Sequence, residues 1–200
     1  MCVEVMLSVD VEGTTYLSLS WAEVEEYASD LAERIHGTYQ LDTLLAVMKG
    51  GAVVGVLVAD RLSVGKIYTV SLRSYMKVGL RGGVEVYQKP PKECIEGKRV
   101  LIVDDIVDSG QSLTTVIQLT REYGAKEVRS ATLLIKESSE CIPEYYSHKV
   151  RGWVFYPWEV REACEEIYAK IGDVERAKKI LTAGLGFPQR EVDRILAKVM

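Results

Sequence analysis

The sequence lacks the features that mark several classes of protein. No apolar run approaches the roughly 18 residues of a membrane-spanning helix. The net charge of -4 gives no global attraction for polyanions, and no local basic patch compensates for it. The first 13 residues have no basic region ahead of their apolar ones, unlike a secretory signal. We therefore expect a cytoplasmic protein that binds neither membranes nor nucleic acid.

Cysteine is also scarce, and no internal repeat or low-complexity tract is present. The cysteines stand far apart, without the paired spacing of a metal site, and in a reducing compartment each is expected to be a free thiol. They are Cys2, Cys94, Cys141 and Cys164. What is present, 48% hydrophobic and 27% charged residues over 200 positions, is typical of one soluble folded domain with a small appendage.

Hydrophobic periodicity predicts the elements at the beginning of the chain. Apolar residues alternate from Val3 to Val11, and Glu12-Gly13 then indicates a strand that turns back toward 16–19 as a small hairpin. Ser20 and Glu23 form a capping box, after which apolar residues recur at helical spacing until Gly37. We expect a helix over 21–36.

An alternation of strands and helices follows. The apolar strands indicate a central, mostly parallel sheet covered by helices on both faces, an α/β fold. The expected elements are a strand at 43–48, a helix at 52–62, strands at 66–72 and 99–103, a helix at 112–123 and a strand at 127–135.

Two stretches interrupt this alternation. Residues 73–98 are a long segment rich in glycine, proline and cations, which is either a surface insertion or a lid. From Glu159 onward the pattern is helical, with Asp173 as a cap and a last helix after Phe187-Pro188. We expect residues 1–158 to form the main domain and 159–200 a helical appendix for packing or subunit contact.

The run VLIVDDIVDSGQSL, residues 100–113, carries the chemistry. Asp104 and Asp105, the acidic pair, follow an apolar strand, and buried unpaired carboxylates are too costly, so we place them at the carboxyl edge of the sheet, after the strand has ended. Open α/β sheets bind ligands there. Residues 108–112, the hydroxyl loop, then offer hydroxyls, free amides and a helix N-terminus, which suit a phosphate. Alternatively, Asp108 and Ser112 only cap the helix.

This run resembles the phosphoribosyl diphosphate (PRPP) signature of type I phosphoribosyltransferases. The resemblance implies that the acidic pair takes the ribose hydroxyls, directly or through Mg²⁺, with Asp105 as a metal ligand. It also implies that the hydroxyl loop holds the 5-phosphate, through Asp108, Ser109, Gly110, Gln111 and Ser112, and that Asp108 is the general base. Threonine is more common in the family at the positions of Ser109 and Ser112, and serine keeps the hydroxyl donor.

Other segments are similar to the purine branch of that family. Residues 49–51, the KGG turn, resemble the diphosphate loop, in which Lys49 is catalytic and Gly50 contributes its amide; a bare K-G-G is otherwise a common turn. Ser74 and Tyr75 resemble the start of the hood, the mobile segment that covers the reaction centre and excludes water. That likeness favours a lid for the long segment.

The expected base site comes from two further features. Lys136 ends a strand, and because an ammonium only donates hydrogen bonds it would select a 6-oxopurine over adenine; alternatively it is an exposed lysine. The segment WVFYPWE, 153–159, resembles the hood of bacterial xanthine-guanine and archaeal purine enzymes, with Trp153 stacking on the base and Val154 meeting its edge. Glu159 either helps to hold the metal or the base, or only begins a helix.

The resemblance implies a Mg²⁺-dependent purine salvage enzyme. It would convert PRPP and guanine, hypoxanthine or xanthine into the nucleoside monophosphate and diphosphate, as a homodimer or homotetramer. The alternatives are a PRPP-sensing regulator with the same fold, a phosphoribosyltransferase for another base, and an acidic phosphoacceptor or phosphatase pocket. The lack of a nucleic-acid surface disfavours the regulator. Lys136 and the Trp153 segment disfavour another base, and the hydroxyl loop disfavours a phosphoacceptor or phosphatase pocket.

Overall fold

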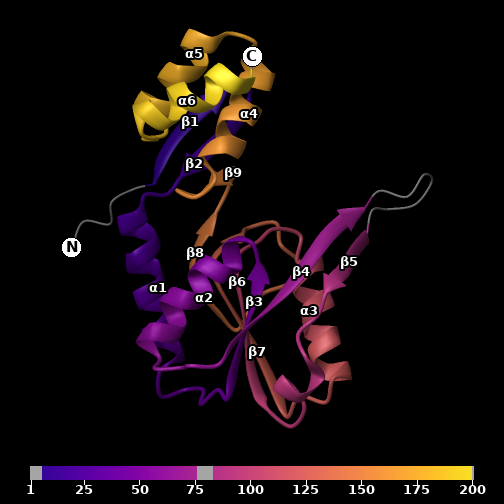
Figure 1. Cartoon of the computed structure of the whole chain (residues 1–200). Coiled ribbons are helices and arrows are strands. Elements are labelled where there is room, and N and C mark those ends of the chain that lie inside the picture. The colour runs from indigo at the N-terminus through magenta and orange to yellow at the C-terminus, as the bar shows by residue number, and fades with distance from the viewer. Residues whose placement is uncertain (1–5, 76–82, 200) are drawn as a thin grey trace. The chain divides into compact units, whose positions relative to one another are not determined.

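The computed structural model describes residues 6–75 and 83–199. The chain divides into two compact units (Figure 1). The sheet unit contains residues 25–150, and the helical unit contains residues 1–24 together with 151–200. The division falls within the first turns of the helix α1 (Trp21–Ile35).

A six-stranded sheet forms the centre of the sheet unit within the described residues. Its strands are parallel except for the edge strand β5, which runs antiparallel to β4. In spatial order the strands are β5 (Gly83–Gln88), β4 (Ile67–Tyr75), β3 (Thr43–Met48), β6 (Arg99–Val107), β7 (Glu127–Lys136) and β8 (Tyr145–Val150).

Helices cover both faces of this sheet, as the sequence predicts. Figure 1 shows α1 and α2 (Gly50–Arg61) on one side and α3 (Gln111–Glu122) on the other. The central strands are almost wholly apolar because both of their faces are covered, and Val100 to Val103 are fully buried. The expected α/β fold class is thus confirmed.

The structure corrects three details of the predicted sheet. The described part of the long 73–98 segment contains regular elements: β4 continues to Tyr75 and pairs with β5, and a 3₁₀ turn follows at Lys92–Cys94. The hairpin was missed because β5 is short and lies among glycine, proline and charged residues. The strand β8 gave no clear alternation and was also missed. The third correction is that β6 extends to Val107, beyond the acidic pair.

The helical unit combines the N-terminal hairpin with the end of the chain. The strands β1 (Leu7–Val11) and β2 (Thr14–Ser18) form the predicted hairpin, and Glu12 and Gly13 both have positive φ, which suits its two-residue turn. Val3 and Val5 lie outside the described residues. The strand β9 (Trp153–Phe155) adds to β2 in parallel. The helical segments are α4 (Val160–Ile171), α5 (Val174–Lys179), a π-helical turn (Ile180–Gly184) and α6 (Gln189–Val199).

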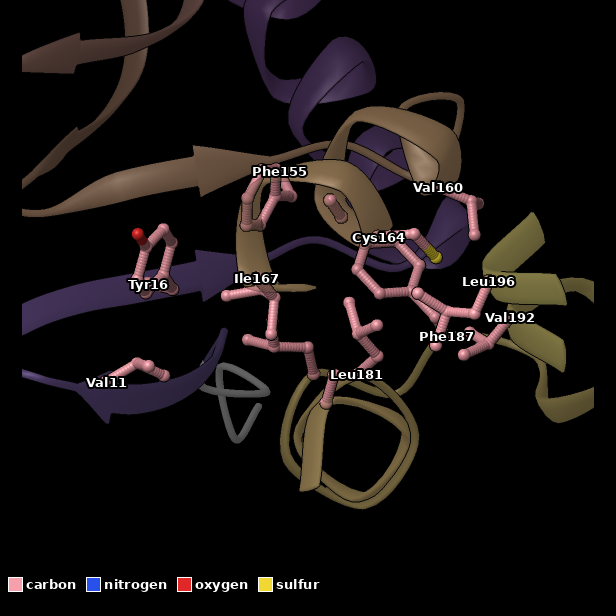
Figure 2. Packing of buried hydrophobic residues seen from close by; sticks show 13 residues of the cluster. Val11, Tyr16, Phe155, Val160, Cys164, Ile167, Leu181, Phe187, Val192 and Leu196 are labelled. Atoms are coloured by element: carbon pink, nitrogen blue, oxygen red, sulfur yellow. The ribbon is translucent and has the colours of Figure 1, made fainter. Parts of the chain in front are cut away.

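One apolar core holds this unit together (Figure 2). Val11 and Tyr16 of the hairpin are buried with Phe155 and with residues of α4 to α6 such as Ile167 and Leu196. The Tyr16 and Phe155 rings stack at 5.5 Å. This division differs from the expected boundary after residue 158, because the hairpin buries its apolar face against the C-terminal helices. Within the described residues, no helix is both long and apolar enough to cross a bilayer.

Candidate functional site

The acidic pair lies where β6 loses one of its two neighbours. Pairing with β3 ends at Val103, whereas pairing with β7 continues through Asp104 to Val107. The expectation that the strand ends before the acidic pair is therefore wrong: β6 continues past the pair because β7 is long enough to keep pairing with it. The location at the carboxyl edge of β3 agrees with the prediction. There Asp104 is 8% exposed and Asp105 is half-buried.

The KGG turn packs directly on the acidic pair. A methyl group built on Gly50 would overlap the Asp105 carboxylate, and one built on Gly51 would lie 2.6 Å from the Val103 carbonyl oxygen. The backbone of β6 leaves no room for a side chain at Gly51, and a side chain at Gly50 would have to displace the Asp105 carboxylate. The helix α2 begins at Gly50, two residues before the predicted start, and the Met48–Lys49 peptide is cis. Lys49 is exposed at this edge.

We expect Gly51→Ala to destabilise the protein by about 1–3 kcal/mol, because the new methyl group would press on the backbone of β6, which cannot yield cheaply. Chemical denaturation measures this free energy of unfolding. Gly65→Ala is the matched control, since a methyl group there meets nothing within 4 Å. Equal stabilities for the two variants would contradict the close packing of the KGG turn.

Burial dominates the electrostatics of the acidic pair. It raises the pKa of the Asp104 carboxyl well above its ordinary value, and the neighbouring Asp105 carboxylate adds to the shift. The Asp104 Oδ1 atom accepts a hydrogen bond of 3.0 Å from the Asp105 amide, and Asp105 Oδ1 accepts one of 2.9 Å from the Ile106 amide. Keeping two carboxylates here costs folding free energy, which is typical of a functional site.

We therefore expect Asp104→Asn to raise the free energy of unfolding at pH 7 by about 1 kcal/mol, since the amide keeps the oxygen acceptor without a charge. Because the pKa of Asp104 is raised in the folded protein, its charge destabilises the fold only above the unfolded pKa of about 3.9. The stability gained by Asp104→Asn should therefore fade as the pH falls toward that value. Thermal melts at pH 7 and near pH 4 test this. A variant less stable than wild type at pH 7 would contradict it.

The hydroxyl loop joins β6 to α3. Gly110 is the N-cap residue of α3 and has a φ of 87°, a left-handed conformation that favours glycine. No side chain caps α3, so the predicted alternative, in which Asp108 and Ser112 serve only as caps, has no support here. The loop and Asp104 line a cavity of about 100 Å³. That is about the volume of three waters, enough for one phosphate-sized group.

Lys136 is the last residue of β7, as predicted. Burial lowers the pKa of its ammonium, and the Asp108 carboxylate opposes this shift, so the two charges lie within electrostatic range of each other. The sheet unit therefore gathers the acidic pair, the KGG turn, the hydroxyl loop and Lys136 at the carboxyl ends of β3, β6 and β7.

The remaining predicted residues belong to β4, to β9 and to the start of α4. Trp153 and Val154 are in β9 of the helical unit, where Trp153 is 47% exposed and Val154 is buried. Glu159 is the N-cap residue of α4, although its side chain caps no amide of that helix; its Oε2 atom accepts a hydrogen bond of 3.0 Å from the Tyr156 amide. Ser74 and Tyr75 are the last two residues of β4.

A metal would have few protein ligands in this site. No group of three or more His, Cys, Asp or Glu side chains is arranged for a metal in residues 6–75 and 83–199. Mg²⁺ usually needs only one or two carboxylates and takes its other ligands from substrate phosphates and water. The acidic pair fits that pattern.

Two residues at the site escaped the sequence analysis. Gly51 was predicted only as part of the diphosphate loop, and its packing against the backbone of β6 was not foreseen. Cys141, regarded only as a free thiol, packs against Gly110. Nothing in the sequence signals a contact between residues 31 positions apart.

Comparison with known proteins agrees with this geometry. The family model for the phosphoribosyl transferase domain matches residues 19–164. A xanthine-guanine phosphoribosyltransferase of Ruegeria sp. is 29% identical over 153 residues, which cover 71% of this chain and 84% of the relative. The structure of a purine phosphoribosyltransferase from Pyrococcus horikoshii is 28% identical, with a TM-score of 0.62 over 72% of this chain and 93% of that one.

A third structure extends the shared fold further along the chain. It is a hypothetical protein from Neisseria gonorrhoeae with bound ppGpp, 20% identical, with a TM-score of 0.66. The match covers 92% of this chain and 97% of that one. The shared fold therefore includes many of the residues that lie outside the family match at 19–164.

Proposed function

Since this chain belongs to the family of proteins with a phosphoribosyl transferase domain, we propose that it transfers ribose 5-phosphate from PRPP to a 6-oxopurine, with release of diphosphate. The base would be guanine, hypoxanthine or xanthine, and the role would be purine salvage. The observation that carries this proposal is the packing of the KGG turn on the acidic pair, beside the hydroxyl loop and its phosphate-sized cavity.

PRPP binding would use three parts of the site. The amides and hydroxyls of the hydroxyl loop would hold the 5-phosphate at the N-terminus of α3. The acidic pair would accept hydrogen bonds from the ribose hydroxyls. Lys49 would lie next to the diphosphate and neutralise its charge as the bond to the ribose breaks. Mg²⁺, held by Asp105 and the substrate's oxygens, would supply further charge neutralisation.

The base would be recognised by donors and by stacking. Lys136 would donate a hydrogen bond to the 6-oxo group, for which the 6-amino group of adenine is a wrong partner. Trp153 would stack on the purine and Val154 would meet its edge. Asp108 would take the proton from the purine N7 as the new bond forms, which places the general base beside Lys136. The segment from Ser74 and Tyr75 onward would exclude water from the activated ribose.

Two measurements on the intact chain test the proposal. Calorimetry with Mg²⁺ present should detect PRPP binding, and a coupled assay should detect diphosphate release when guanine, hypoxanthine or xanthine is added. Adenine is the matched control and should give little release. Failure to bind PRPP would refute the proposal, and binding without release with any base would instead favour a PRPP-sensing regulator.

A further inference from the structure

We propose that Cys141 is a positioning residue for PRPP, because its Cβ atom supports Gly110 and so holds the hydroxyl loop in its binding conformation. The inference rests on the proposed function, which assigns the 5-phosphate to that loop. Cys141 itself would not touch the substrate. It would act by keeping the loop amides directed at the phosphate, so that less conformational entropy is lost when PRPP binds.

The contact between Cys141 and Gly110 is close. A methyl group built on Gly110 would overlap the Cys141 Cβ atom and lie 3.2 Å from the Cys141 backbone nitrogen. Gly110 therefore rests on both the side chain and the backbone of Cys141. Because this glycine has a φ of 87°, the contact lies at the position where the loop takes its left-handed conformation.

The loop continues into the first turn of α3, where the Thr114 amide donates to the Gly110 carbonyl oxygen at 2.9 Å and the Thr115 hydroxyl donates to the Gln111 carbonyl oxygen at 2.8 Å. No side chain caps α3, and the hydrogen bond that the Gln111 amide donates to Ser109 Oγ is long, at 3.4 Å. The loop also borders a cavity of about 490 Å³, which it shares with Gly83, Val84 and Glu140. Cys141 also lines this cavity, so its contact with Gly110 lies on the side of the loop that faces this space.

Cys141 is itself held firmly. The Ser139 hydroxyl donates to the Cys141 carbonyl oxygen at 3.0 Å and accepts from the Cys141 amide at 3.3 Å. The Ser139 amide donates to the carbonyl oxygen of Lys136 at 3.0 Å, and Cys141 packs against the apolar core of the sheet unit. This short turn thus connects the end of β7, where the purine would bind, to the loop where the phosphate would bind.

Steady-state kinetics of single variants test the inference. Cys141→Gly removes the supporting Cβ atom and should raise the KM for PRPP about tenfold, or roughly 1.4 kcal/mol, with kcat and the KM for guanine within about twofold of wild type. Cys141→Ala keeps the Cβ atom and should restore the KM. Ile142→Gly adds the same flexibility at the exposed neighbouring residue and should leave the KM unchanged. A structural role alone would lower stability without this selective change.

A double variant tests the contact directly. Gly110→Ala should raise the KM for PRPP more than tenfold, through backbone strain and overlap with Cys141. Adding Cys141→Gly removes the overlap, so the double variant should bind PRPP better than Gly110→Ala alone. Should Cys141→Gly fail to fold, Ser139→Ala, which loosens the turn, should raise the KM about threefold.

The outcomes separate this inference from the proposed function. A wild-type chain that neither binds PRPP nor releases diphosphate would refute the proposed function. An active wild type combined with an unchanged KM in Cys141→Gly, or with strictly additive effects in the double variant, would refute the role of Cys141 alone.

Discussion

Asp108→Asn is expected to lower turnover by about 10² to 10⁴-fold while PRPP still binds. The amide cannot take the N7 proton, but it keeps the shape of the side chain and leaves the amides of the hydroxyl loop in place. The residue is exposed at the beginning of that loop, so its replacement should cost little stability. Pre-steady-state and steady-state rates with guanine measure turnover, and calorimetry measures PRPP affinity.

The control for Asp108 is Asp60→Asn, the same chemical change at an exposed position near the end of α2. It should leave turnover unchanged. Near-normal turnover in Asp108→Asn would remove this residue from the role of general base. A loss of PRPP binding equal to the loss of turnover would instead assign it to phosphate binding.

Lys136→Met is expected to lower kcat/KM for guanine by about 10²-fold, with PRPP affinity close to wild type. A hydrogen bond from a charged donor contributes about 1.5–3 kcal/mol, and methionine fills the same space without donating. Burial lowers the pKa of Lys136, so its ammonium should lose its proton at a lower pH than an ordinary lysine does. The wild-type kcat/KM for guanine should therefore begin to fall at that lower pH. The variant should lose that part of the pH profile.

Lys149→Met provides the matched control for Lys136. Lys149 is exposed on the adjacent strand β8, where it pairs with Ile135, so its loss should not change base use. Guanine kinetics at several pH values, with PRPP saturating, compare the two variants. Equal activity toward guanine before and after Lys136→Met would exclude this lysine from the base site.

The cost of the acidic pair and the close packing of the KGG turn have the same origin. Both place charged or closely packed groups at one edge of the sheet, where the surrounding apolar strands fix the backbone. Asp104 is expected to lower stability at neutral pH, and Gly51 leaves no room for a side chain. Natural sites commonly give up stability in this way in exchange for a preorganised site.

Local signals predicted much of this protein correctly. Alternating and helical periodicity gave the N-terminal hairpin, α1 and the central strands, because side-chain spacing alone decides which face each element buries. The position of Lys136 at the end of β7 and the Asp173 cap of α5, whose carboxylate accepts from the Arg176 amide at 2.8 Å, were also predicted. The acidic pair with its hydroxyl loop indicated a phosphate site from local spacing alone, and that site remains a prediction.

The features that were missed depend on contacts between distant parts of the chain. The strands β5 and β8 form because a neighbouring strand offers its free hydrogen-bonding edge, and β6 continues past the acidic pair because β7 does. The grouping of the hairpin with the C-terminal helices follows from one shared apolar core. Short-range patterns carry no information on such pairings.

The sequence by itself determined the chemistry of this protein: two carboxylates, a hydroxyl-bearing glycine loop and a lysine at a strand end, each set by neighbours a few residues away. Only the tertiary structure decided which of these groups meet. In the folded chain, Gly50 and Gly51 pack against the acidic pair, and Cys141 packs against Gly110. These contacts form because the order of the strands in the sheet brings distant segments to one edge, and no local pattern encodes that order.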